Sequence, residues 1–210
     1  FLTFQSTKSE QIKQTFYELD ATLSHRLELI EQLFDREIGQ ANTLAKSPQI
    51  INQAIIFNNA STVNDVISAE LAQYLVSIKD KEHLKNIYLI NNTGDIKYAT
   101  ASTDDVGTNI YTGYYNNSSL ATLARDTIRT KESQHSKFET YAADGNSFSA
   151  FIAHPIIKKD ILQGVVLFQI SPQVLASISN TDATLGETGE VILGYLNGNT
   201  VQYLSERRFA

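Results

Sequence analysis

This 210-residue sequence predicts an α+β protein with a long N-terminal helix, an antiparallel sheet domain and the start of a second, incomplete sheet module. Two patterns lead to this prediction. Apolar residues first recur every three or four positions, as on one face of a helix, and after residue 85 they fall in short runs separated by turn formers. We therefore divide the chain into a stalk helix (1–46), a sheet domain (47–180), and a connector with one hairpin (181–210).

The stalk helix is predicted by a single apolar stripe that runs without proline for about ten turns. Globular helices average about a dozen residues, so this helix is long and its stripe must be covered. We expect the cover to be the sheet domain, a second copy of the chain, or both. The stripe consists of Ile12, Phe16, Leu19, Leu23, Leu27, Ile30, Phe34, Ile38, Ala41 and Ala45.

Two shorter helices are expected between the stalk and the first strand. Ser47 is suited to cap a helix that begins at Pro48, because proline is favoured at the first helical position. Ser61 or Thr62 is expected to cap the next helix, which ends in the charged turn at 79–83.

The sheet domain is expected to contain five strands, a long polar loop and one further helix. A hairpin opens it, with the turn NNTGD between its two strands. The loop over 101–117 is rich in tyrosine and amide residues, and a helix over 120–129 follows it. In this order, the elements are those of a PAS-like domain. The strands are predicted over 86–90, 96–100, 137–142, 148–157 and 161–170.

Composition and charge exclude several functions for this segment. The net charge of −6 and the scattered basic residues argue against nucleic-acid binding, which needs a basic surface. The absence of Cys removes disulfides, thiolate catalysis and cysteine metal sites, and the four His residues lack metal-ligand spacing. The sequence has no nucleophile-elbow or catalytic-triad pattern. We therefore expect no enzyme activity, no cofactor and no metal in this segment.

Two glycines, Gly186 and Gly189, raise the question of a phosphate-binding loop. Such a loop needs a helix N-terminus and a nearby lysine, whereas here a predicted strand follows and no lysine is close in sequence. The glycines are therefore interpreted as a turn at the start of the second module. The hairpin after them needs support from other residues or another chain, because an isolated hairpin is marginal in water.

Three stretches, taken in order, resemble a known family. They are NIYLINNTGDIKYATASTDDVGTNI (86–110), FSAFIAHPIIKKDILQGVVLFQIS (148–171) and LGETGEVILGYLNGNTVQYLSERRF (185–209). Their order and spacing are similar to those of the extracytoplasmic double-Cache domains of bacterial transmembrane receptors. No single motif is specific. The resemblance covers about 85–210 in its motifs and 1–84 only in its helical architecture.

The resemblance implies a periplasmic sensor domain that is not itself catalytic. Family members begin just outside the membrane with a long helix, continue through a membrane-distal and a membrane-proximal PAS-like module, and end in a second membrane span. We thus expect flanking spans outside this segment, a homodimer through the N-terminal helix, and an unidentified small-molecule ligand. The expected output is a histidine kinase, with a diguanylate cyclase or a chemoreceptor as alternatives. The apolar start at 1–4 is either the end of such a span or an ordinary helix start.

The expected ligand site lies between the tyrosine-rich loop and one face of the sheet. Aromatic rings supply contact area and hydroxyls supply direction, which suits recognition of a small polar molecule. The alternative is that the rings only cover the sheet. Arg125 and Arg129 follow the loop, but the aromatic–Arg–aromatic spacing of amino-acid-sensing members is absent and the chain has no Trp. The candidate ligand contacts are Tyr98, Tyr111, Tyr114, Tyr115, Tyr141, Phe151 and, at the rim, His154.

Two functions of different classes remain open from the sequence. In the first, the segment is a ligand sensor whose closure on a small molecule shifts the long helix. In the second, it is a helical interaction or dimerisation module with a structural PAS-like domain that binds no small ligand. A polar-lined cleft beneath the tyrosine loop would favour the sensor, and an all-apolar interior would favour the interaction module.

Overall fold

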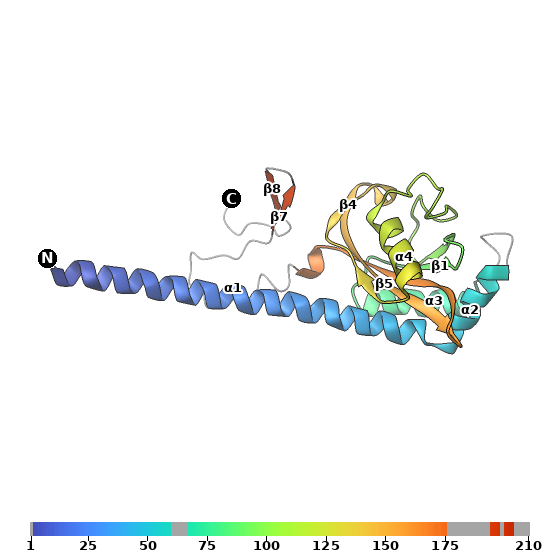
Figure 1. Ribbon diagram of the computed structural model, residues 1–210, viewed down its shortest axis with the longest axis horizontal. Coiled ribbons are helices and arrows are strands. Elements are labelled where there is room, and N and C mark those ends of the chain that lie inside the picture. Colours follow the sequence, from blue (N-terminus) through green and yellow to red (C-terminus); the bar gives the residue numbers. More distant parts are fainter. Residues whose placement is uncertain (1, 60–66, 176–193, 198–199, 204–210) are drawn as a thin grey trace.

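The computed structural model describes residues 2–59, 67–175, 194–197 and 200–203. A single long helix, α1 (Leu2–Ala45), extends well beyond a sheet domain that lies at its C-terminal end (Figure 1). The predicted fold class, a long helix followed by an antiparallel α+β domain, is confirmed. Among the described residues, no helix combines the length and the apolar character that a membrane crossing requires.

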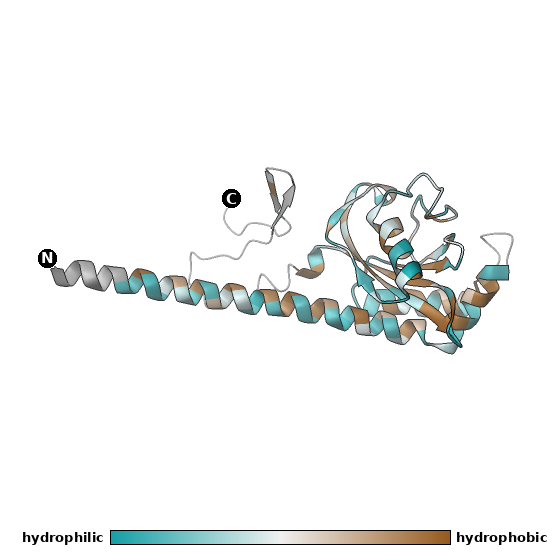
Figure 2. Ribbon diagram, viewed as in Figure 1, coloured by the Kyte–Doolittle hydropathy of each residue, from teal (hydrophilic) through white to brown (hydrophobic). Residues whose placement is uncertain are grey.

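The apolar stripe of α1 divides into a covered part and an open part. From Leu33 onward the stripe packs against the sheet domain, and Ala41 and Leu44 are buried there. Closer to the N-terminus, apolar residues recur along the helix where the sheet domain no longer covers it (Figure 2). The open part consists of Ile12, Phe16, Leu19, Leu23 and Leu27, each between 48 and 68 % exposed.

The two short helices pack beside α1. The first, α2 (Pro48–Asn59), begins at the predicted proline, and its Ile50 amide donates to the Ser47 hydroxyl at 3.4 Å. The second, α3 (Ala69–Lys81), is capped by Ser68 and not by Ser61 or Thr62 as predicted. The reason is local, because the Ser68 hydroxyl accepts the Leu71 amide at 3.1 Å. Residues 60–66 lie outside the described part of the chain.

The sheet has the strand order β2–β1–β6–β5–β3, β4 also pairs with β5, and every pairing is antiparallel. The two-residue strand β3 was not predicted, because so short a run has no readable periodicity. Before the turn into β5, β4 is followed by a 3₁₀ turn, η1 (Ala142–Asp144). The strands are β1 (Asn86–Asn91), β2 (Ile96–Ala99), β3 (Gln134–His135), β4 (Glu139–Tyr141), β5 (Ser147–Lys158) and β6 (Ile161–Ile170).

The three central strands β1, β6 and β5 are covered on both faces, because successive side chains of a strand point to opposite sides. One face packs against α1, α2 and α3, and we call it the helical face. Its sheet residues include Ile87, Leu89, Ile152, Val166 and Phe168. The other face packs against α4 (Ser119–Thr130), and we call it the α4 face. Its sheet residues include Tyr88, Ile90, Phe151, Ala153 and Leu167.

A separate two-stranded sheet follows in the C-terminal part of the chain. It consists of β7 (Gly194–Asn197) and β8 (Thr200–Tyr203), paired antiparallel as the predicted hairpin. The assignment of this hairpin to a second module stays a prediction, and Gly186 and Gly189 lie outside the described residues.

The close approach of β6 to β1 at Gly164 provides a test of this arrangement. A methyl group at this position would lie 2.2 Å from the Ile90 carbonyl oxygen, so the two central strands would have to separate. We expect Gly164→Ala to lower the free energy of unfolding by about 1–3 kcal/mol, as overpacking of a core does. Urea unfolding followed by circular dichroism measures this change.

The matched control is Gly39→Ala in α1, where an added methyl group meets nothing within 4 Å. Alanine in a helix interior is favoured over glycine by about 0.5–1 kcal/mol, so this variant should be at least as stable as the parent chain. Equal urea midpoints for Gly164→Ala and the parent chain would contradict the strand arrangement.

Candidate functional site

A group of buried polar side chains lies on the α4 face of the sheet, and we call it the polar cluster. Strand alternation places its sheet members on one side, because Gln169 lies opposite Phe151 in the β5–β6 register and Ser149 is two residues from Phe151. All its members except Asp144 are fully buried. The polar cluster consists of Tyr88, Asp105, Tyr141, Asp144, Ser149 and Gln169.

Gln169 connects three strands within the polar cluster. The Tyr88 hydroxyl donates to its Oε1 at 3.1 Å, while its Nε2 donates to Asp144 Oδ2 at 2.7 Å and to Ser149 Oγ at 2.9 Å. Both amide hydrogens and the carbonyl oxygen are therefore used, which determines the orientation of the side chain. Burial, followed by the charge of Asp105, raises the pKa of Tyr88 far above its ordinary value, so this hydroxyl stays protonated.

Asp144 is a compensated carboxylate. Burial alone would raise its pKa, but hydrogen bonds from Lys85, Ser147 and Gln169 outweigh that effect and the pKa is lowered. Lys85 Nζ lies 2.5 Å from Asp144 Oδ2, and Ser147 donates to the same oxygen at 2.7 Å. Asp144 is therefore charged, and its Oδ2 accepts from three protein donors.

Asp105 differs from Asp144, because it is completely buried and only partly satisfied. Its Oδ2 accepts a hydrogen bond from the Tyr141 hydroxyl, but the described residues supply no hydrogen-bond partner for Oδ1. Burial is the largest effect on the pKa of this carboxyl and raises it; the nearby Thr103 hydroxyl and the Asp105 backbone amide lower it by less, and the like charges of Asp144 and Asp104 add to the rise. Buried acceptors are rarely left without a donor. The free Oδ1 therefore suits a ligand that brings a hydrogen-bond donor, and an ammonium group above all.

The loop that carries Asp105 is held over the sheet by Arg125 of α4. Its Nη1 donates to the carbonyl oxygens of Ile110 and Asn116 at 2.5 and 2.6 Å. Arg125 is thus committed to the loop backbone, while Arg129 forms an exposed ion pair with Asp126. Among the described residues, no three His, Cys, Asp or Glu side chains gather in a way that would hold a metal ion.

No family model matches this sequence, and no curated protein matches it. Solved structures do match. The sensor domain of the V. cholerae histidine kinase DctB has 14 % identity and a TM-score of 0.58, over 80 % of this chain and 60 % of that one. The ligand-binding domain of the Campylobacter jejuni chemoreceptor Tlp3, solved with 4-methylisoleucine, has 15 % identity and a TM-score of 0.54, over 75 % and 59 %. The E. coli DcuS sensor domain has 12 % identity and a TM-score of 0.51, over 70 % and 95 %.

This chain has the fold of a Cache-type sensor domain. It spans about 60 % of the length of the DctB and Tlp3 domains and nearly all of the DcuS domain. Since identities of 12–15 % establish the fold alone, any ligand has to be argued from the residues of this chain.

Of the seven predicted contacts, two lie at the polar cluster. Tyr141 belongs to the cluster, and Phe151 stacks edge-on against its ring with centroids 4.9 Å apart. Tyr115 lies beside the same core, and its hydroxyl is 3.5 Å from Asp104. Tyr111 and Tyr114 are 47 and 89 % exposed, so they lie on the outer surface of the loop.

The remaining two predicted contacts, Tyr98 and His154, lie on the helical face. Tyr98 is opposite Leu89 in the β1–β2 register and packs with the helical-face core. His154 is three residues from Phe151, and an odd separation in a strand places the two side chains on opposite faces. The structure therefore does not bring Tyr98 or His154 to the polar cluster.

The ligand contacts predicted from the sequence do not include five members of the polar cluster, Tyr88, Asp105, Asp144, Ser149 and Gln169. One signal was available. Ser149 and Gln169 are polar residues inside the apolar runs of β5 and β6, where an outward-facing position would not exist in a strand covered on both sides. A polar residue in such a run indicates an internal hydrogen-bond network.

His154 instead links the sheet to the stalk helix. Its Nε2 lies 2.7 Å from Asn42 Oδ1 of α1, and its Nδ1 lies 3.4 Å from Ser133 Oγ. Both contacts suit a neutral ring that donates from Nε2 and accepts at Nδ1. Burial, with a smaller effect of the positive Lys46, lowers the pKa of His154 from 6.5 to about 4.

This lowered pKa predicts a pH dependence of stability. The unfolded chain takes up the proton near pH 6.5, whereas the native chain takes it up only near pH 4. Stability is therefore constant above pH 6.5 and falls as the pH drops from 6.5 to 4. The His154 ring is only half-buried. We therefore expect the free energy of unfolding to change with pH by well below the unscreened limit of about 1.4 kcal/mol per pH unit.

Thermal unfolding between pH 4 and 8 measures this dependence. His154→Gln keeps an N–H for Asn42 but cannot titrate, so its profile should be flatter than that of the parent chain. His25→Gln, at an exposed position of α1, is the matched control and should keep the parent profile. Parallel profiles for His154→Gln and the parent chain would exclude this role.

Proposed function

We propose that this chain is the extracytoplasmic small-molecule-sensing part of a bacterial transmembrane signalling receptor. The observation that carries the proposal is the polar cluster beneath the clamped loop, with a buried carboxylate oxygen that has no protein donor. An ammonium donor from a ligand would compensate this oxygen, since burying a carboxylate without a partner is costly. Similarity in fold to the histidine kinase DctB supports a histidine kinase as the output, and similarity to the chemoreceptor Tlp3 supports a chemoreceptor as an alternative. A diguanylate cyclase is the second alternative.

The chemistry of the polar cluster favours a ligand with an ammonium group. Asp105 offers a buried carboxyl oxygen as an acceptor, which an ammonium group would keep ionised, and the Tyr141 and Tyr88 rings offer aromatic surface beside it. Lys85, the basic side chain next to the cluster, is already paired with Asp144. An anionic ligand would therefore find no unpaired positive charge on this lysine. The bound molecule of the Tlp3 structure, 4-methylisoleucine, belongs to the same amine-bearing class. We therefore place the ligand among the amino acids and organic amines.

A screen by thermal shift over amino acids, amines and carboxylates tests this proposal. A ligand at 100 times its dissociation constant adds about 2.7 kcal/mol to stability. For any stabilising amine, Asp105→Asn should weaken binding about 10- to 100-fold, which is the usual loss for a hydrogen bond to a charged group. Isothermal titration calorimetry gives the affinities.

The adjacent Asp104 provides a matched control, because it is exposed and Asp104→Asn makes the same chemical change one residue away. This variant should keep the parent affinity. Asp105→Asn should also melt no lower than the parent chain without ligand, because it removes an uncompensated buried charge. An amine that binds Asp105→Asn as tightly as the parent chain would refute the ligand assignment. Failure of every compound in the screen would favour the structural interaction module.

We further propose that the receptor dimerises through the open part of the α1 stripe. Its five apolar residues are spaced four, three, four and four positions apart, which forms one continuous ridge on a helix. Within the described part of the chain, the sheet domain covers only the stripe beyond it, so a second copy of α1 is the partner that matches the ridge in length and character.

Disulfide trapping tests this dimer, and the absence of native Cys leaves no background. Leu23→Cys should form a disulfide-linked dimer under mild oxidation, because facing positions of paired helices approach within disulfide range. Glu28→Cys lies on another side of the helix and should cross-link far less. Non-reducing electrophoresis measures both yields. Equal cross-linking at the two positions would show that collision, not a defined helix pair, brings the chains together.

A further inference from the structure

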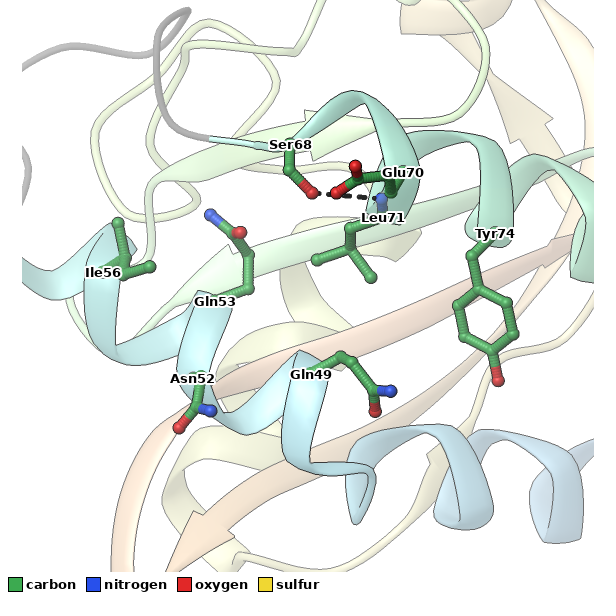
Figure 3. A pocket seen from close by; sticks show the side chains of 8 residues that line it. All are labelled: Gln49, Asn52, Gln53, Ile56, Ser68, Glu70, Leu71 and Tyr74. Atoms are coloured by element: carbon green, nitrogen blue, oxygen red, sulfur yellow. Dashed lines mark hydrogen bonds between the residues drawn. The ribbon is translucent and has the colours of Figure 1, made fainter.

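A second concave site lies on the helical face, away from the polar cluster. It is a cavity of about 460 Å³ between α2 and α3 (Figure 3). This volume is within the range of about 300–1,000 Å³ that small-molecule pockets occupy. The central sheet separates this cavity from Asp105, because α2 and α3 pack on one face and the polar cluster lies on the other.

One wall of the cavity presents carboxamides. Gln49, Asn52 and Gln53 are spaced so that they share one face of α2, and all three line the cavity. The side chains of Gln49 and Asn52 make no hydrogen bond or ion pair within the described part of the chain. Each retains a carbonyl acceptor and two N–H donors for a bound molecule.

The charge of the cavity is negative. Glu70, in the first turn of α3, is the one charged residue among the side chains that line it. Its carboxylate forms no ion pair with any described residue. No lysine, arginine or histidine lines the cavity, so an anionic ligand would meet repulsion and no compensating charge. The carboxylate of Glu70 therefore favours a ligand that carries a positive charge.

The apolar part of the cavity shows where the body of a ligand would lie. Leu71 is buried and points into the space between the two helices, with Tyr74 on one side of it and Ile56 on the other (Figure 3). Tyr74 and Ile56 are 46 and 47 % exposed, although they belong to a concave surface. An alkyl or aryl group over Leu71 would cover both, and a tyrosine ring also attracts a cation.

We propose that the groove between α2 and α3 is a second ligand site that takes an organic amine. The ammonium group pairs with Glu70, the alkyl or aryl body lies over Leu71 against Tyr74, and the carboxamides of α2 bind polar substituents. The ammonium group could belong to a free amine or to the lysine side chain of a peptide. The experiment therefore compares a free amine with a lysine-containing peptide. The site does not depend on the ligand proposed for the polar cluster, because the two use separate faces of the sheet.

The test uses two probes with nearly the same body and opposite charge, tyramine and 4-hydroxyphenylacetate. Each is titrated into the ¹⁵N-labelled chain carrying Asp105→Asn, which weakens any binding at the polar cluster, and shifts at the two sites are read from different amides. Tyramine should shift the backbone amides around residues 49–56 and 68–74, and 4-hydroxyphenylacetate should not. Glu70→Gln should weaken tyramine about three- to fivefold, as expected for an exposed ion pair. Tyr74→Ala should weaken it about fivefold or more.

Glu31→Gln is the matched control, since it removes one exposed carboxylate from α1 outside the groove, and it should leave the affinity unchanged. A lysine-containing tetrapeptide forms the second arm. Tighter binding of the peptide than of tyramine at the same amides supports the site and identifies a peptide as the source of the amine. Equal binding of the two charged probes, absence of shifts in the groove, or full affinity in Glu70→Gln would each overturn the proposal.

Discussion

The structure depends on the pairing of β1, β6 and β5 at the centre of the sheet, where every side chain is covered on one face or the other. This pairing is tight enough that Gly164, opposite Asn91, must lack a side chain, because an added methyl group would collide with the Ile90 carbonyl oxygen. Because alternate residues of each strand point to opposite faces, the same three strands determine what reaches α1 and what reaches α4. A change of one residue in register would exchange the two sets completely.

The two faces have different characters. The helical face is an apolar core that holds the C-terminal part of α1, with His154 and Asn42 as a polar contact at its edge. The α4 face combines an apolar core with a buried hydrogen-bond network in which Gln169 joins β1, β5 and η1. Buried polar networks specify one arrangement of the groups they join, because any other arrangement leaves donors or acceptors unpaired. Asp105 lies beside this network, bonded to Tyr141, and one of its oxygens has no hydrogen-bond partner among the described residues.

Only one layer of sheet separates the polar cluster from α1, so a single strand can connect the two. In β5, Phe151 contacts Tyr141 of the polar cluster, and Ile152 next to it packs with the core that holds α1. A displacement of this strand therefore acts on both faces at once, since packed cores transmit strain and do not deform freely. The rigid α1, which continues for many turns beyond the domain, is the element able to carry such a displacement over distance (Figure 1).

Elements of the fold could be predicted where they depend on residues close together in the sequence, and could not where they depend on distant residues. The limits of α1, the proline start of α2 and the hairpin of β1 and β2 depend on neighbouring residues, so periodicity and capping chemistry were sufficient. The cap of α3 was assigned to Ser61 or Thr62 instead of Ser68, because several hydroxyl residues precede that helix and local chemistry does not choose among them. The strand β3 was missed, because its two residues are a strand only through their partner β5.

The site was less predictable, because contact between distant residues defines it. The sequence by itself determined an α+β chain with a long amphipathic helix, no metal-binding cysteine and a tyrosine-rich loop near the sheet. Only the tertiary structure decided which tyrosines face inward. It buried Tyr88 and Tyr141 beside Asp105, left Tyr114 exposed, and placed Tyr98 and His154 on the opposite face. The physical reason is that composition determines which groups are available, whereas strand register and the cover on each face determine which of them lose contact with water and must find a partner.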